Sequence, residues 1–255
     1  MTDDRPRLSA RGLGVRFGRV EALADVGVGI GAGRVLVVLG RNASGKSTLL
    51  RVLAGVLNPT GGQVFLDGRS LRDWSPSQRA RRLGYLAQQP RLVGGFTVAE
   101  SVAFGGHAAG GVDAMTVADA LDDVGLAALA RRPFRDLSVG QRQRAALARV
   151  LVQVGDDGVM ALDEPFAAQD PGEVERLIRI VRARAAGGRA VVAAVHDAAI
   201  AHAIADDVLL LDGGRRVFLG PAAEGLTPER LGELFGITFT AGPAGPTPCF
   251  GGGSA

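Results

Sequence analysis

Cysteine and lysine are almost absent from this chain of 255 residues, which contains one cysteine, Cys249, and one lysine, Lys46. A single cysteine excludes a disulfide framework and a metal site built from thiolates. No apolar run approaches the ~20 residues of a membrane-spanning helix, and residues 1–5 do not have the pattern of a signal peptide. We therefore expect a soluble, cytoplasmic chain that would need a partner for any role at a membrane.

The chain also has little excess charge, since its formal net charge is only +3. That balance does not demand nucleic acid, and we predict no nucleic-acid partner. A hydrophobic content of 47% is ordinary for a globular protein, and the length allows one large domain or a core with a small subdomain. We find no internal repeat.

The single lysine lies in a glycine-rich loop that follows the apolar run Val35–Leu39. The loop fits G-x-x-x-x-G-K-[ST], and the residues after it open a helix. Backbone N–H groups of such a loop converge on phosphate oxygens, while Lys46 would reach the β- and γ-phosphates and Ser47 would ligate Mg²⁺. The predicted nucleotide-binding residues here are Gly40, Arg41, Asn42, Ala43, Ser44, Gly45, Lys46, Ser47 and Thr48.

Lysine at this one position has a physical reason. The chain has 29 Lys and Arg residues, and every one except Lys46 is arginine. A compact ammonium on a flexible stem suits a crowded phosphate pocket, whereas a planar guanidinium is a poor substitute. A glycine-rich turn without a ligand would place the only lysine here by accident, so we favour the phosphate-binding interpretation.

Four further candidate residues follow three predicted buried strands. Val159–Leu162 leads into Asp163 and Glu164, an acidic pair that suggests metal binding and water activation in a chain with this loop. Without the loop, the pair would be a solvated turn. Gln88 follows Leu83–Ala87 and can serve as a metal or water ligand, although alone it would more often be a loop residue. His196 follows Arg189–Val195 and could reach a γ-phosphate.

Other segments give weaker signals. Ser138, Gly140 and Gln141 begin a strongly helical run and form an anion-binding helix start. Phe17 ends a predicted strand, where it either stacks on an adenine ring or is one more core residue. The residues from Thr97 to about Ala130 form a helical insert whose apolar surface is either core or a docking face. From residue 241 the sequence is rich in Gly, Pro and Ser and predicts a disordered tail.

Taken in order, these motifs resemble those of the ATP-binding subunits of ABC transporters over about residues 7–240. Residues 40–48 resemble the Walker A loop, Phe17 the A-loop aromatic and Gln88 the Q-loop glutamine. Leu137-Ser138-Val139-Gly140-Gln141 is similar to the LSGGQ signature. Asp163 and Glu164 resemble the Walker B aspartate and catalytic glutamate, Asp170 the D-loop aspartate and His196 the switch histidine.

The resemblance implies a fold, a mechanism and partners. The fold would be α/β, with a P-loop NTPase core on a mainly parallel sheet, an N-terminal antiparallel β subdomain and an all-helical signature subdomain at about 90–150, within one domain of residues 1–240. Two copies would hold ATP between the Walker A loop of one and the signature of the other. Asp163, Ser47 and Gln88 would hold Mg²⁺, while Glu164, His196 and Gln88 would serve hydrolysis. The chain would be a peripheral subunit at the cytoplasmic face of the membrane, bound to permease subunits and served indirectly by a substrate-binding protein.

Three positions depart from the family pattern. Val139 replaces the first signature glycine, which implies altered affinity, and Ala43 stands where glycine is usual in Walker A, which constrains the loop. Ala167-Ala168-Gln169-Asp170 replaces the usual Ser-Ala-Leu-Asp and leaves the intersubunit role of this D-loop open. We also assign no function to the tail or to Cys249.

Residues 70–76, 80–88, 97–105 and 226–236 look like the importer branch for iron-siderophores, haem and cobalamin. Two other classes stay open. One is the ATPase of another ABC transporter for metal-ion import or export, and the other is a soluble ABC ATPase of iron–sulfur cluster assembly. A helical membrane partner would favour transport, and a soluble scaffold partner would favour assembly.

Overall fold

The computed structural model describes residues 5–249, and its centre is a six-stranded sheet in the order β10-β9-β3-β8-β7-β6. All neighbours in this sheet pair in parallel except β10 with β9. Its strands are β3 (Val35–Leu39), β6 (Leu83–Leu86), β7 (Val159–Asp163), β8 (Ala190–Val195), β9 (Asp207–Asp212) and β10 (Arg215–Pro221). The four strands that lead into predicted site residues, β3, β6, β7 and β8, are parallel, so their carboxyl ends lie on the same side of the sheet.

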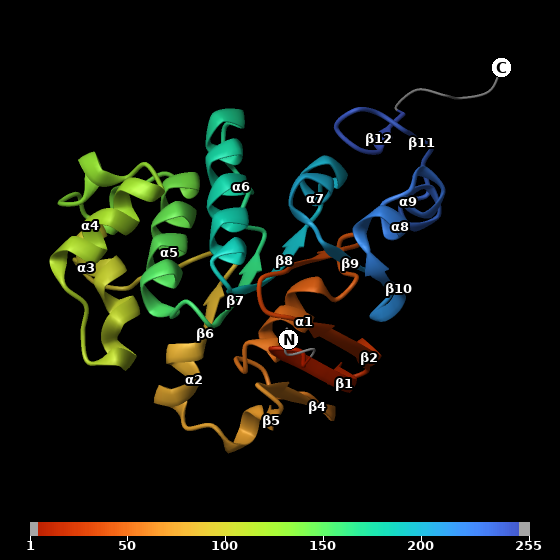
Figure 1. Cartoon of the computed structure of the whole chain (residues 1–255), viewed down its shortest axis with the longest axis horizontal. Coiled ribbons are helices and arrows are strands. Elements are labelled where there is room, and N and C mark those ends of the chain that lie inside the picture. Colours follow the sequence, from red (N-terminus) through yellow and green to blue (C-terminus); the bar gives the residue numbers. More distant parts are fainter. Residues whose placement is uncertain (1–4, 250–255) are drawn as a thin grey trace.

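A second sheet is antiparallel and has the order β2-β1-β4-β5. It contains β1 (Leu8–Phe17), β2 (Val20–Ile30), β4 (Gly61–Leu66) and β5 (Arg69–Ser70). The sequence predicts an N-terminal antiparallel element and a hairpin-like stretch at residues 63–68. In the structure β4 and β5 form that hairpin, and β4 pairs with β1, so the hairpin completes the N-terminal sheet. This subdomain is therefore built from two separate parts of the chain (Figure 1).

Helix α1 (Lys46–Leu53) lies between the two sheets and joins their cores. Side chains of β3 alternate between the two faces of the sheet, as the period of a strand requires. Leu36 and Val38 pack in the core with α1 and the antiparallel sheet, while Val37 and Leu39 pack in the core on the other face. Because β3 is buried on both faces, the strand that leads into the loop is fully apolar.

The other face of the main sheet is covered by α6 (Pro171–Ala186) and α7 (Ala198–Ile204), and a helical segment lies beyond its β6 edge (Figure 1). This segment contains α3 (Val98–Ala103), α4 (Ala114–Asp123), α5 (Val139–Gln153) and short 3-10 turns. Shorter helices elsewhere are α2 (Pro76–Arg82), α8 (Ala222–Gly225) and α9 (Pro228–Phe235). The capping boxes at Thr97 and Ser75 are present, so local sequence sets where these helices begin.

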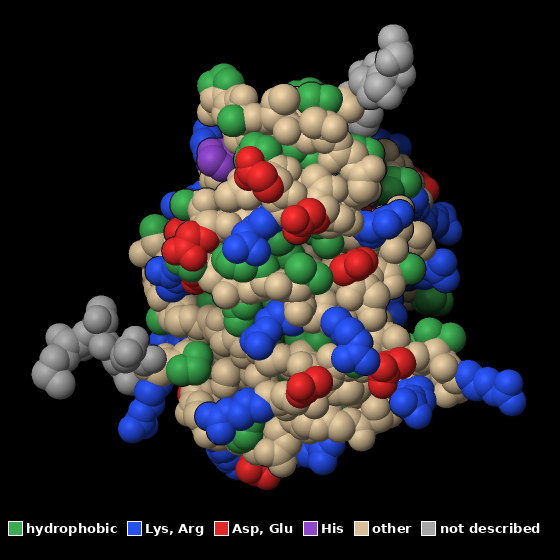
Figure 2. Space-filling model, turned by 90° about the vertical axis from the view of Figure 1, so that its right-hand side faces the viewer, with side chains coloured by type: hydrophobic (Ala, Val, Ile, Leu, Met, Phe, Trp, Pro, Cys, Tyr) green, Lys and Arg blue, Asp and Glu red, His purple; other side chains and the backbone are tan. Residues whose placement is uncertain are grey.

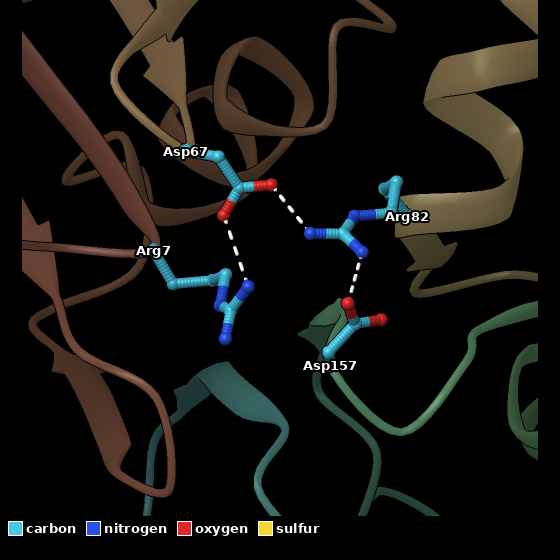
Figure 3. Close-up of polar contacts among 4 residues, drawn as sticks. All are labelled: Arg7, Asp67, Arg82 and Asp157. Carbon is cyan, nitrogen blue, oxygen red and sulfur yellow. Dashed lines mark hydrogen bonds and ion pairs between the residues drawn. The ribbon is translucent and has the colours of Figure 1, made fainter. Parts of the chain in front are cut away.

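A chain of alternating charges ties the antiparallel sheet to the helical side of the molecule (Figure 3). Asp67, in the turn after β4, accepts from Arg7 at 3.1 Å and from Arg82 at 2.7 Å. Arg82 ends α2 and also pairs with Asp157, which lies just before β7. Four separate segments are thereby held together by side chains of which Arg7, Asp67 and Arg82 are 23–26% exposed and Asp157 is 57% exposed.

The end of the described chain differs from the predicted disorder. Residues Phe239–Thr240 and Thr247–Pro248 pair as the short antiparallel strands β11 and β12. The N–H of Cys249 also donates to the carbonyl of Thr238 at 2.9 Å. Tight turns of the Gly/Pro-rich sequence allow this hairpin without a periodic apolar pattern. The predicted tail therefore has structure up to Cys249, and residues 250–255 lie outside the described residues.

The structure confirms the predicted fold class, a mainly parallel α/β core with an antiparallel subdomain and a helical subdomain. Within residues 5–249, no helix is both long enough and apolar enough to span a bilayer. Figure 2 shows one face of the molecule, on which arginine and acidic side chains are interspersed rather than gathered in a field of one sign.

Candidate functional site: a nucleotide cavity

The glycine-rich loop between β3 and α1 requires two of its glycines. A Cβ at Gly40 would lie 2.1 Å from the carbonyl oxygen of Leu211, and Gly45 caps α1 at a φ of 102°. Ala43 has a left-handed φ of 62°, a conformation in which a side chain costs about 1 kcal/mol. This finding explains why glycine is usual at that position. The Ser44 hydroxyl is buried in the loop without a hydrogen-bond partner, as expected for a donor available to a bound oxyanion.

Lys46 is the first residue of α1, and only 6% of its surface is exposed. Its Nζ donates to the carbonyls of Gly40 at 2.7 Å and Arg41 at 2.9 Å, so the ammonium lies across its own loop. Burial lowers the pKa of Lys46, and the nearby charges of Glu164 and Asp163 oppose that shift. The ammonium therefore lies in a poorly solvated site, where an anionic ligand would strongly stabilise its charged form.

Asp163 ends β7 and is fully buried beside α1. The Ser47 hydroxyl donates to its Oδ1 at 2.9 Å, and the Tyr85 hydroxyl donates to Oδ2 at 3.3 Å. Burial is the main cause that raises the pKa of Asp163, while the hydrogen bond from Ser47 acts against it. A hydroxyl and a carboxylate at this separation supply oxygen ligands of the kind that Mg²⁺ prefers.

Glu164 follows Asp163 and turns away from the strand with a left-handed φ of 51°. Its Oε2 accepts from Gln88 Nε2 at 2.9 Å, which joins the ends of β6 and β7. A non-glycine residue with such a φ is strained by roughly 1–3 kcal/mol and persists only when its surroundings hold it. The strain directs the carboxylate into the cavity instead of along the sheet.

Lys46, Ser47, Gln88 and Glu164 line one cavity of about 700 Å³, and the buried Asp163 is joined to it through Ser47. The cavity is lined by Val20, Glu21, Ala22, residues 42–48, Gln88, Glu164, His196, Gly213 and Gly214. His196 is exposed between β8 and the N-cap residue of α7. Phe17 is 51% exposed and does not line the cavity, whereas Val20, its partner across the β1–β2 turn, does line it. The structure thus places Phe17 beside the rim and not in the core.

The signature segment lies elsewhere on the molecule and does not line this cavity. Ser138 and Gln141 satisfy each other in a capping box at the start of α5, and the Val139 side chain is 62% exposed. Asp170 begins α6 without a side-chain capping bond. Within one chain, therefore, the predicted nucleotide-binding residues form two separate groups.

Sequence reasoning missed three contributors to the site. Tyr85 touches Asp163, and Gln143 on α5 donates to the carbonyls of Asp163 at 3.4 Å and Glu164 at 3.3 Å. Gly214 donates its N–H to Ser44 from the β9–β10 turn. Gln143 could have been found, because an amide on the buried face of an apolar helix needs partners.

In the part of the chain that the structure describes, no group of three His, Cys, Asp or Glu side chains is placed to hold a metal. This does not argue against Mg²⁺, which commonly takes one or two protein oxygens and completes its shell with water and phosphate. The Ser47–Asp163 pair fits that mode of binding.

Comparison with known proteins gives an independent result. The family described as "ABC transporter" matches residues 23–167. The "Hemin import ATP-binding protein HmuV" of Pseudomonas fluorescens (strain Pf0-1) is 42% identical over 236 residues, which cover 90% of this chain and 92% of that protein. The protein of the same name from Bradyrhizobium diazoefficiens is 38% identical over 237 residues, with 90% and 88% covered.

Solved structures share the fold. A chain from an inward-facing structure, described as being of the metal-chelate ABC transporter type, superposes with a TM-score of 0.77 at 24% identity over 96% of this chain and 98% of that chain. The ATP-binding cassette MJ0796, in a dimeric post-hydrolysis state bound to ADP and Pi, gives a TM-score of 0.75 at 23% identity, with 84% and 98% covered.

Proposed function

The chain belongs to the ABC transporter family of ATP-binding proteins, and from this premise we propose that it is the ATP-hydrolysing subunit of a haem importer. ATP hydrolysis is supported by Lys46, Ser47, Gln88 and Glu164, which line one cavity, with Asp163 bound to Ser47 behind it. These residues provide a cation that binds the phosphates, oxygen atoms that bind a metal ion, and a carboxylate that orients the attacking water. The haem cargo is supported by the names of the relatives.

In hydrolysis, each residue would act from its present position. Lys46 and the loop N–H groups would bind the β- and γ-phosphates, and Glu164 would orient and polarise the attacking water. Ser47 and Asp163 would hold Mg²⁺, which neutralises phosphate charge when bound. His196, which also lines the cavity, would steady the γ-phosphate, and Phe17 would stack on the adenine from the rim.

The separation of the two groups within one chain supports a composite site. Ser138, Gly140 and Gln141 would close over the nucleotide of a second copy, because in their own chain they do not reach the cavity. Two copies placed head to tail would each complete the other's site, giving a closed symmetric dimer. Hydrolysis would remove the γ-phosphate that holds the two copies together.

A groove next to the site suits the permease, which would hold the chain at the cytoplasmic face of the membrane. It is lined by Gln88, Gln89, Pro90, Arg91, Leu92, Val93, Phe134, Arg135, Val139 and Arg142. Three arginines and no acidic side chain line it, and Val93 is 92% exposed. An apolar permease segment with acidic residues would fit. Gln88 lines both this groove and the cavity, so docking there would bear on Glu164.

The substrate class is tested by reconstitution. The chain would be purified with its permease from membranes, placed in lipid nanodiscs and assayed for ATP hydrolysis with a haem-loaded substrate-binding protein. We expect haemin to raise the rate several-fold, because transport couples substrate delivery to closure of the ATP site.

Matched assays would use a ferric siderophore, cobalamin and free divalent metal ions in place of haemin. Stimulation by one of these alone would replace haem as the cargo while leaving the ATPase assignment intact. Recovery of the chain with a soluble scaffold and no permease would instead favour cluster assembly and contradict the transport proposal.

A further inference from the structure

The D-loop position Gln169, which departs from the family pattern, makes a specific contact within the chain. Its Nε2 donates to the carbonyl oxygen of Gly140 at 3.1 Å and to that of Ala167 at 3.4 Å. Gly140 lies in the first turn of α5, and Gln169 lies between β7 and α6. A leucine in this place could pack there but could not donate.

The two segments touch backbone to backbone at this point. A Cβ on Gly140 would lie 2.4 Å from the carbonyl oxygen of Ala168, so glycine is required for the approach. Ala168 itself has a left-handed φ of 57°. The segment from Glu164 to Ala168 thus contains two strained residues, and strain of this kind persists only where neighbours hold it.

Two amides hold this segment against α5, one at each end. Gln143, on the second turn of α5, donates to the Asp163 and Glu164 carbonyls, and Gln169 binds back to Gly140. Gln143 is buried and Gln169 half-buried, so both bonds are shielded from water. The first turn of α5 and the carboxylate of Glu164 are therefore fixed to one another through the segment between them.

We propose that Gln169 is a positioning residue that fixes the signature turn of this chain for the nucleotide bound by a second copy. The inference rests on the composite site proposed above. Valine at position 139 adds a side chain, where the family has glycine, to the surface of the first turn that would meet the nucleotide. The position of that turn therefore matters more in this chain than in one with glycine there. Gln169 supplies the fixed placement before the second copy arrives, which lowers the ordering cost of closure.

The test is Gln169→Met, which keeps the length of the side chain and removes its donor. It would be made in a Glu164→Gln chain, so that hydrolysis does not disperse the dimer, and ATP-driven dimerisation would be followed by sedimentation velocity. We expect the dimer dissociation constant to rise roughly tenfold, since each of the two chains must then order its signature turn on closure. Binding of ATP to the dilute monomer should stay within twofold of the parent.

The matched control is Gln153→Met on the same helix. Gln153 also donates its amide to backbone carbonyls, those of Ala80 at 3.0 Å and Leu83 at 3.3 Å, but far from Gly140 in α5. It should lower stability about as much and leave dimerisation unchanged. The inference would be overturned, with the proposed function left intact, if the Gln169→Met chain and its parent had the same dimer dissociation constant. The same holds if Gln153→Met raised that constant as much as Gln169→Met does. A Glu164→Gln parent that never dimerises with ATP would remove the composite site as well.

Discussion

Replacing Glu164 with glutamine is expected to slow ATP hydrolysis by at least about 100-fold while ATP still binds, because the amide cannot polarise water as the carboxylate does. Glutamine has the same length and keeps an oxygen that can accept from Gln88, so the geometry of the cavity should survive. Phosphate release at steady state measures the first effect, and a nucleotide titration of the same sample measures the second.

A matched control is Glu21→Gln, since Glu21 also lines the cavity but bonds only to Arg16 and Arg215 at its exposed side. It removes the same charge from the same cavity and should keep most of the hydrolysis rate. If the Glu164→Gln chain turned over at the normal rate, another group would have to activate the water.

Replacing Lys46 with alanine is expected to weaken ATP binding by a factor of at least about 100, because a charged hydrogen-bond donor in a poorly solvated site is lost. Two carbonyls of the loop, those of Gly40 and Arg41, would also lose their donor. Titration with a fluorescent ATP analogue measures the change.

Because Lys46 is the single lysine of the chain, ATP binding can also be followed in the unmutated protein by chemical modification of its side chain. Apart from the N-terminal amine, an amine-specific reagent can modify only Lys46, whose pKa is lowered by burial. ATP should protect this site from modification, as mass spectrometry would show. The conservative Lys46→Arg should not restore ATP binding. The larger, planar guanidinium does not fit the space that the lysine side chain occupies, because Lys46 is only 6% exposed. Tight ATP binding by the alanine variant would contradict the loop assignment.

Much of the fold was accessible from the sequence, because its signals are local. Apolar runs such as Val35–Leu39, the capping residue Thr97 and the glycine-rich loop each fix an element without reference to distant residues. The antiparallel sheet was only partly predicted, since pairing of β4 with β1 depends on segments about 50 residues apart. The β11–β12 hairpin was missed because its turns carry no periodicity.

The site shows the same division. Strand ends at Asp163, Gln88 and His196 placed the chemistry at one edge of the sheet, as parallel topology requires. The left-handed backbone of Glu164 and the hydrogen-bond partners of the Gln143 and Gln169 amides could not be predicted, because they depend on how α5 packs against β7. These contacts join parts of the chain that have no sequence signal in common.

The composite site is tested most directly by mixing two inactive chains and measuring ATP hydrolysis. One carries Lys46→Ala and keeps its signature; the other carries Ser138→Glu at an exposed position and keeps its loop. Each chain alone should be nearly inactive, whereas an equal mixture should recover up to about a quarter of normal activity, since half of the random pairs are mixed and each has one complete site. A mixture no more active than the sum of its parts would contradict the account.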